Sequence, residues 1–167
     1  MTTSLHSVVG RIRSLLEEKN IAYRFFEHAA VRTSEEAMKQ RPEYTLQQGA
    51  KALIVCGETA TKEKKFFMAV IPANKRLDGR KAAAAAEVKK VRFATKEESD
   101  KITGGIEFGG VPPFGNLFEL AVYVDPTLFE NAEIIFNCGD RRASIAMSSE
   151  DYRSIIPSTI ADTVEDK

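Results

Sequence analysis

The sequence lacks many of the residue patterns on which common enzyme classes depend. Its 167 residues contain no tryptophan, two histidines and two cysteines. His6 and His28 cannot bind a metal without further ligands, and Cys56 and Cys138 do not have the paired spacing of a zinc site. The Gly-x-Ser-x-Gly, P-loop and dinucleotide-binding motifs are also missing. These absences argue against a zinc enzyme, an α/β-hydrolase, a P-loop enzyme and a Rossmann oxidoreductase, so we expect no metal and no cofactor.

Long hydrophobic runs are missing as well. No apolar stretch approaches the roughly 20 residues that cross a bilayer, and Arg11 and Arg13 interrupt the first one, so neither a membrane span nor a signal peptide is expected. Cys56 lies in an apolar run typical of a core strand, and Cys138 lies in an expected turn without an acid–base partner nearby in sequence. The sequence therefore predicts a cytoplasmic protein with free thiols.

The net charge is zero, but the charged residues are unevenly distributed. Residues 61–92 contain ten Lys and Arg against three Asp and Glu, a local charge of +7, whereas residues 93–167 have a local charge of −8. A basic middle third can attract a phosphate backbone, and the alternative is a solvated basic face. The candidate contacts are Lys75, Arg76, Lys89 and Lys90.

Hydrophobic periodicity and capping signals predict helices and strands in mixed order. Helices are expected at residues 4–19, 33–41, 79–86, 95–101 and 149–155, with His6 solvated on the first. Strands are expected at residues 21–26, 52–56, 66–71, 91–94, 118–124, 133–137 and 143–147. This order favours an α+β fold, with a mixed, mainly antiparallel curved sheet of about seven strands flanked by helices. We expect one domain over residues 1–157 and a frayed acidic tail over residues 158–167.

The stretch Gly109-Gly110-Val111-Pro112-Pro113-Phe114-Gly115 organises the prediction of function. Three glycines and two prolines in seven residues cannot form an ordinary helix or central strand. We expect a rigid loop whose free backbone N–H and C=O groups point at a small ligand. The alternative is a tight connection without chemistry.

Lys51 is the candidate cation for the same site. It leads into the apolar run Ala52-Leu53-Ile54-Val55, so its backbone is expected to be fixed at a strand end. An ammonium in that position can hold a phosphate or polarise a carbonyl at the rim of a cleft. The alternative is a lysine that extends into water from the end of a strand.

Several motifs taken in order resemble one known family. The chain from about residue 4 to residue 156 resembles the YbaK/prolyl-tRNA synthetase-associated domain family of aminoacyl-tRNA deacylases. The similarity rests on the expected first helix and on these stretches: Ala22-Tyr23-Arg24-Phe25-Phe26-Glu27-His28, Thr33-Ser34-Glu35-Glu36-Ala37, Ala50-Lys51-Ala52-Leu53-Ile54-Val55, Thr103-Gly104, Gly109 to Gly115, Phe136-Asn137-Cys138-Gly139 and Ile145-Ala146-Met147-Ser148-Ser149-Glu150-Asp151-Tyr152.

The resemblance implies a site and a substrate. The implied reaction is hydrolysis in trans of the ester of mischarged tRNA, with tRNA for proline carrying alanine or cysteine as the expected substrate and prolyl-tRNA synthetase as a candidate partner. It assigns catalytic roles to Lys51, Gly109 and Gly110, without a covalent intermediate. The residues that it places at the substrate are Tyr23, Phe25, His28, Val111, Pro112, Pro113 and Gly139.

Two features depart from the family pattern. The stretch 103–108 is not the family's commonest version, and Arg141 stands where many relatives have histidine. No role of that histidine is therefore carried over. A module of the same fold that binds tRNA or a synthetase without catalysis is the alternative function.

Overall fold

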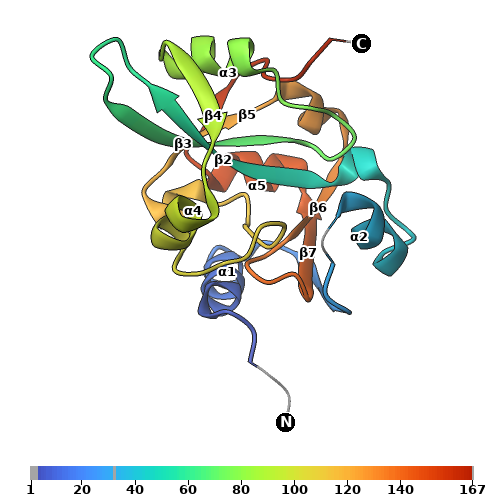
Figure 1. Cartoon of the computed structure of the whole chain (residues 1–167). Coiled ribbons are helices and arrows are strands. Elements are labelled where there is room, and N and C mark those ends of the chain that lie inside the picture. Colours follow the sequence, from blue (N-terminus) through green and yellow to red (C-terminus); the bar gives the residue numbers. More distant parts are fainter. Residues whose placement is uncertain (1–3, 32, 167) are drawn as a thin grey trace.

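The chain folds around two β-sheets, as the computed structural model of residues 4–31 and 33–166 shows (Figure 1). The smaller sheet has the order β1-β7-β6 and is antiparallel throughout. The larger sheet has the order β4-β2-β3-β5-β8, with antiparallel pairs on both sides of β2 and parallel pairs on both sides of β5. The strands are β1 (Tyr23–Glu27), β2 (Ala50–Glu58), β3 (Lys64–Pro72), β4 (Lys90–Phe93), β5 (Ala121–Val124), β6 (Glu133–Asn137), β7 (Ala143–Ser148) and β8 (Thr159–Ile160).

The predicted fold class is confirmed, although the strands are divided differently. Eight strands form two sheets among the described residues, where about seven strands in one curved sheet were expected. The strand expected at 118–124 begins only at Ala121, because the residues before it form a short 3₁₀ helix that ends with Glu119 at a φ of 59°.

Most helices begin at the capping residues that the sequence indicates. Thr33 accepts a hydrogen bond from the backbone of Glu36, and Thr95 forms a reciprocal capping box with Glu98. The helices are α1 (Ser7–Glu18), α2 (Ser34–Gln40), α3 (Gly79–Ala86), α4 (Lys96–Thr103) and α5 (Ser149–Ile155), with 3₁₀ turns η1 (Leu46–Gln48), η2 (Gly115–Phe118) and η3 (Pro126–Glu130). His6 caps α1 through its Nδ1 atom, 3.1 Å from the Val8 nitrogen, so the expectation of a solvated His6 is wrong.

Alternation along β3 divides the core in two. Met68 and Val70 join the main cluster, which also contains Ile12 and Leu16 of α1. Phe67 and Ala69 point to the opposite face and pack against the alanines of α3. Apolar residues on both faces bury β3 from Phe67 to Pro72 and make it the centre of the larger sheet. No helix in the described part of the chain is long and apolar enough to cross a membrane.

The expected frayed tail is ordered over residues 158–166. β8 pairs in parallel with β5, and Val164 bridges to Leu77. Thr163 is fully buried, and its backbone N–H donates to the buried carboxylate of Asp125 at 2.8 Å. The prediction was wrong because it rested on the acidic composition of the segment, whereas Thr163 and Val164 face the interior.

Candidate active site

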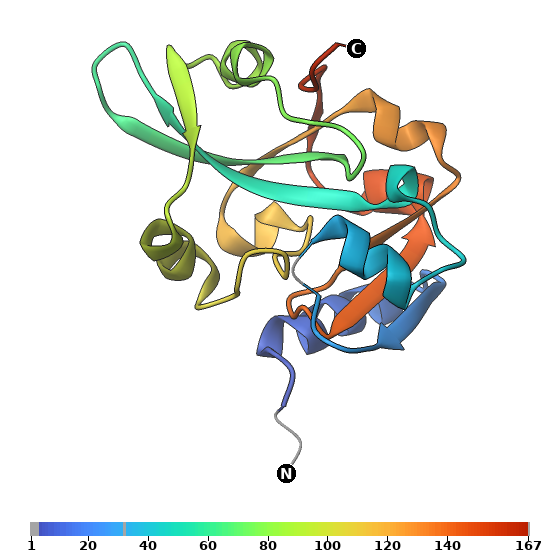
Figure 2. The same cartoon turned by 45° about the vertical axis from the view of Figure 1, so that its right-hand side comes forward.

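One cavity of about 440 Å³ brings together three of the ten candidate site residues, Lys51, Gly109 and Val111. It is lined by β2, α2, the segment that follows α4 and the end of β6. Figure 2 shows the segment that follows α4 beneath β2, and α2 lies to the right of this segment. Two cations, Arg41 and Lys51, line the cavity, and no Asp or Glu is among its described lining residues. The cavity is therefore mainly apolar with a positive potential, which suits a ligand with both apolar and anionic parts.

Lys51 enters the cavity from the second residue of β2. Its half-buried ammonium donates to the backbone carbonyl of Lys75 at a distance of 3.3 Å. Burial lowers the pKa of Lys51, Arg76 lowers it further, and Glu35 opposes both effects. Because an ammonium has three donors, two remain for a ligand after the bond to Lys75 among the described contacts.

The cavity side of β2 has a gap in its backbone pairing at Ala52. The Ile54 carbonyl accepts from the Ala94 nitrogen at 3.0 Å, and at the other end Gly49 forms a parallel bridge with Ile135. Alternate residues of a strand direct their N–H and C=O groups to the same edge, so those of Ala52 point where those of Ile54 do. No described strand lies opposite Ala52, which leaves one donor and one acceptor on the lining of the cavity.

The glycine–proline loop forms the facing wall. Gly109 and Val111 line the cavity, and Gly109 has a φ of +88°, a left-handed conformation that glycine adopts without strain. Pro112 and Pro113 are buried beneath and do not line it. The fully buried Tyr152 hydroxyl donates to the Pro113 carbonyl at 2.5 Å. The loop is thus supported from below, as the sequence predicted for a rigid element.

Gly110 faces away from the cavity. A Cβ atom at Gly110 would lie 3.3 Å from both the Glu107 carbonyl oxygen and the Arg141 nitrogen. The same two residues form an ion pair. Gly110 thus allows two backbone segments to approach closely, and Arg141 clamps the stretch that leads into the loop.

Asn137 joins the loop to the smaller sheet. Its side-chain amide donates to the Gly109 carbonyl, and its Oδ1 atom accepts from the Ser144 hydroxyl at 3.1 Å. Arg41 donates to the same hydroxyl at 3.0 Å, and the Nε2 atom of His28 lies 2.7 Å from it. Ser144 is fully buried, so this network fixes the carbonyl of Gly109 from behind.

Arg41 is a buried cation without an acidic partner at ion-pair distance in the described part of the chain. The residue is 8% exposed, and its Nε atom donates to the Ala37 carbonyl at 3.3 Å. Burial lowers its pKa to about 10, while Glu43 acts in the opposite direction. The guanidinium adds positive potential to the cavity and connects α2 to Ser144.

Two predicted substrate residues lie elsewhere. The Tyr23 hydroxyl accepts from Arg13 Nε at 3.1 Å and donates to Glu17 at 2.7 Å, and the Phe25 ring lies 4.0 Å from the Arg13 guanidinium carbon. Both side chains therefore face α1, and neither lines the cavity. The prediction that Tyr23 and Phe25 set the size of this cavity is wrong. Alternation along β1 directs both side chains to the other face of the sheet.

His28 and Gly139 also lie outside the lining. His28 reaches the cavity only through Ser144, and burial lowers the pKa of its imidazole. Gly139 has a φ of +118°, and a Cβ atom there would overlap Val8 of α1. Gly139 is therefore required by the packing of α1 in this structure.

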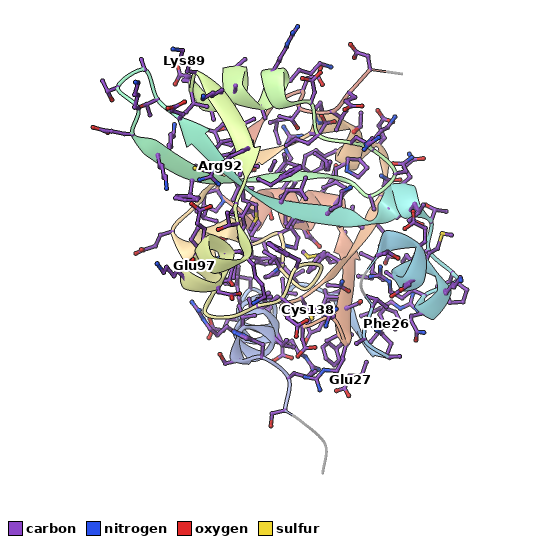
Figure 3. The ribbon with its side chains drawn as sticks, viewed as in Figure 1. Phe26, Glu27, Lys89, Arg92, Glu97 and Cys138 are labelled. Atoms are coloured by element: carbon purple, nitrogen blue, oxygen red, sulfur yellow. The ribbon has the colours of Figure 1, made fainter. Side chains whose placement is uncertain are left out.

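Cys138 lies in the interior (Figure 3). Burial raises the pKa of its thiol to about 12, so the reactive thiolate is suppressed. Neither Cys138 nor Cys56 lines the cavity. Neither buried sulfur is placed to attack a substrate there.

Sequence reasoning missed several lining residues. Asn137 was noted only as part of a motif, and Arg41 only as the end of a helix. Phe93, Ser99 and Phe108 carried no signal, since they belong to no recognised motif and meet only in three dimensions.

The comparisons with known proteins agree with this geometry. A family model described as an aminoacyl-tRNA editing domain matches residues 28–155, more than half of the chain. The chain belongs to the aminoacyl-tRNA editing domain family. Lys51, the Ala52 edge and the glycine–proline loop all lie within the part that matches this editing domain.

Individual relatives point the same way. A multifunctional Ser/Thr-tRNA deacylase, ProXp-y of Escherichia coli strain K12, is 32% identical over 87% of this chain and 86% of its own length. A solved structure described as that of a proposed trans-editing enzyme for prolyl-tRNA synthetase has a TM-score of 0.78 at 25% identity, covering 98% of this chain and 100% of its own. A structure of a hypothetical protein, with a TM-score of 0.81 at 23% identity over 93% of this chain and 99% of its own, shares the fold.

Proposed function

We propose that this protein hydrolyses the ester bond of mischarged tRNA in trans. The observation that carries the proposal is the convergence of three groups on one cavity: the Lys51 ammonium, the unpaired edge of Ala52 and the loop residues Gly109 and Val111. A cation holds the phosphate or ribose of the tRNA terminus, and fixed backbone groups orient the ester and a water molecule. Such a site works by positioning and by stabilising charge.

The proposed mechanism is direct attack by water. The hydroxyl side chains on the cavity, among them Thr33 and Thr45, have no histidine or carboxylate beside them among the lining residues that the structure describes. A Ser or Thr nucleophile needs such a base. The Ala52 N–H or a loop N–H can stabilise the negative charge that develops on the ester carbonyl, and the Ala52 carbonyl can accept from the α-ammonium group.

Small amino acids are the proposed substrates. We place tRNA for proline carrying alanine or cysteine first, with prolyl-tRNA synthetase as the partner, in agreement with the description of the structural relative. Serine and threonine esters are the second candidate, because the relative with 32% identity is a Ser/Thr-tRNA deacylase. A synthetase rejects smaller or isosteric amino acids poorly, so a second, hydrolytic site increases fidelity.

A panel of charged tRNAs tests the proposal. Purified protein is mixed with tRNA for proline that carries alanine, cysteine or proline. Further samples contain serine or threonine attached either to the cognate tRNA or to a non-cognate tRNA. Release of labelled amino acid is followed against buffer. Faster release of a small amino acid, with prolyl-tRNA spared, supports an editing hydrolase. Tight binding of every RNA without accelerated release contradicts it and favours the non-catalytic binding module.

A further inference from the structure

The wall of the cavity opposite α2 differs from the rest. Residues 93–108 contribute Phe93, Ser99 and Phe108 to the lining. Phe93 is 59% exposed and Phe108 is 53% exposed, although each is a large apolar side chain. Together with Met38, which also lines the cavity, they are the exposed large hydrophobic residues in the described part of the chain. Such a cluster around one opening marks a binding surface.

Ser99 supplies an independent observation. It is 1% exposed and lines the same cavity, and its hydroxyl has no hydrogen-bond partner among the described residues. The neighbouring hydroxyl on α4, Thr103, by contrast donates to the Ser99 carbonyl at 2.8 Å and accepts from Ile106 at 3.1 Å. A buried hydroxyl without a partner is costly, so a polar group that enters the cavity gains by bonding to Ser99.

We propose that Phe93, Phe108 and Ser99 form a subsite for the terminal base of the tRNA, with the rings stacking on the base and the Ser99 hydroxyl bonding its edge. The inference rests on the proposed function, since an ester held at Gly109 and Val111 has the terminal ribose and base attached to it. Phe108 directly precedes Gly109, so the terminal base and the ester of the substrate contact adjacent residues of the chain. Arg41 and Lys51 line the cavity, and no carboxylate is among its described lining residues, which matches the phosphate that joins this nucleotide to the next.

A purine base fits these residues better than an apolar side chain does. Unstacked bases of single-stranded RNA are recognised by aromatic side chains and by hydrogen bonds to their edges. Two phenylalanines and one hydroxyl offer both kinds of contact. An aliphatic ligand would leave the Ser99 hydroxyl without a partner.

Fluorescence of the terminal base tests the subsite without hydrolysis. The probe is an uncharged RNA hairpin with the single-stranded tRNA 3′ end, in which 2-aminopurine replaces the terminal adenine. Stacking quenches this fluorophore. We expect wild-type protein to quench it, and Phe93→Leu and Phe108→Leu each to weaken binding on the order of tenfold and to reduce the quench. Phe93→Tyr should retain both, because the ring is kept.

Two variants complete the design. Phe129→Leu is the matched control, since Phe129 is half-buried, packs beside Arg153 and does not line the cavity. Ser99→Ala should reduce the preference for an RNA ending in adenine over one ending in uracil by about fivefold, the effect of one hydrogen bond. Its melting temperature should equal or exceed that of wild type, because no described partner is lost.

The outcomes separate this inference from the proposed function. Binding of the RNA without quench, or an unchanged quench in both leucine variants, overturns the subsite even if ester hydrolysis is observed. A wild-type quench that the leucine variants lose supports the subsite even if no ester is hydrolysed. A lower melting temperature in Ser99→Ala overturns the role of Ser99. If a leucine variant converts a dimer to a monomer, Phe93 and Phe108 form a contact between two copies of the chain. This result also overturns the proposal.

Discussion

The side-chain amide of Asn137 donates a hydrogen bond to the backbone carbonyl of Gly109, across 28 residues of sequence. Through this bond the smaller sheet determines the orientation of the glycine–proline loop. The Ser144 hydroxyl holds the other end of the Asn137 amide, so the network has little freedom to rotate.

Asn137→Ala should therefore reduce hydrolysis more than it reduces stability. Without the amide, the Gly109 peptide can rotate, and loss of precise positioning costs up to about a hundredfold in rate. The measurement is release of amino acid from mischarged tRNA, with circular dichroism as the folding control. Asn116→Ala, at an exposed asparagine of η2, is the matched control. Equal rates in the two variants would show that Asn137 does not position the loop.

Lys51→Ala should abolish most of the hydrolysis and leave the fold intact. Lys51 is the only lysine among the described lining residues. Removal of its ammonium is expected to lower the rate of hydrolysis on the order of a hundredfold. Lys51→Arg should rescue the rate only in part, because a planar guanidinium differs from an ammonium in reach and shape. The assay is single-turnover release at saturating enzyme. A folded Lys51→Ala protein with a nearly wild-type rate would show that Lys51 has no catalytic role.

Gly110→Ala should impair the site by displacing the loop. The added methyl would press on the Glu107 carbonyl and the Arg141 nitrogen, each 3.3 Å away, and not on the substrate. We expect a lower melting temperature together with slower hydrolysis. Gly10→Ala is the control, since a Cβ atom there meets nothing within 4 Å. A Gly110→Ala protein with normal stability and reduced activity would show instead that the methyl blocks the substrate.

Lys75 and Arg76 should contribute to RNA attraction more than the other basic residues of the middle third. Lys75 contacts Lys51 through its carbonyl, whereas Lys89 lies at the outer end of β4 (Figure 3). Lys90 is paired with Glu58 at 3.0 Å. Lys75→Ala with Arg76→Ala should weaken binding across RNA sequences and reduce the salt slope by about two, as expected for two lost phosphate contacts.

Lys90→Ala serves as the control in that experiment, because its charge is already compensated. The measurement is the affinity for an uncharged tRNA hairpin between low and physiological salt. An unchanged slope in the double variant would exclude a direct phosphate contact of Lys75 and Arg76.

Asp140 should make stability depend on acid pH. The guanidinium of Arg142 holds the pKa of this carboxyl at about 2, below its usual value, and the backbone of Arg142 and His6 contributes. Since the folded-state pKa is depressed, this contribution is present above pH 4 and is lost as the pH falls towards 2. Because the Asp140–Arg142 pair is partly exposed, solvent screening limits this contribution to about 1 kcal/mol. Urea unfolding of Asp140→Asn should show reduced stability at pH 7 and a weaker pH dependence between 4 and 2.

Features that depend on residues close in sequence were predicted better than features that depend on contacts between distant residues. The cap of Thr95 on Glu98 spans three residues, and the sequence predicts it directly. Lys51, Gly109 and Val111 line one cavity, and the catalytic and substrate-binding roles that the sequence assigns to them stay predictions. The role of Asn137 depends on a contact 28 residues away, which no local pattern encodes.

Two errors have the same physical origin. The family resemblance placed Tyr23 and Phe25 at the substrate, and a strand position does not reveal which face meets the cavity and which meets α1. The final segment was expected to fray because its composition is acidic, but Thr163 finds a buried partner in Asp125, 38 residues earlier. Tertiary partners outweigh local composition in both cases.

The gap at Ala52 also bears on the solubility of the protein. An open strand edge normally allows another chain to pair with it and to begin a growing fibre. Here β4 closes the edge beyond Ile54, and Ile135 closes it at Gly49, so the opening is too short for a foreign strand to find a second hydrogen-bonded pair. A small molecule needs only one donor and one acceptor and can still use it. The protein thereby presents bare backbone to a ligand while remaining closed to aggregation along β2.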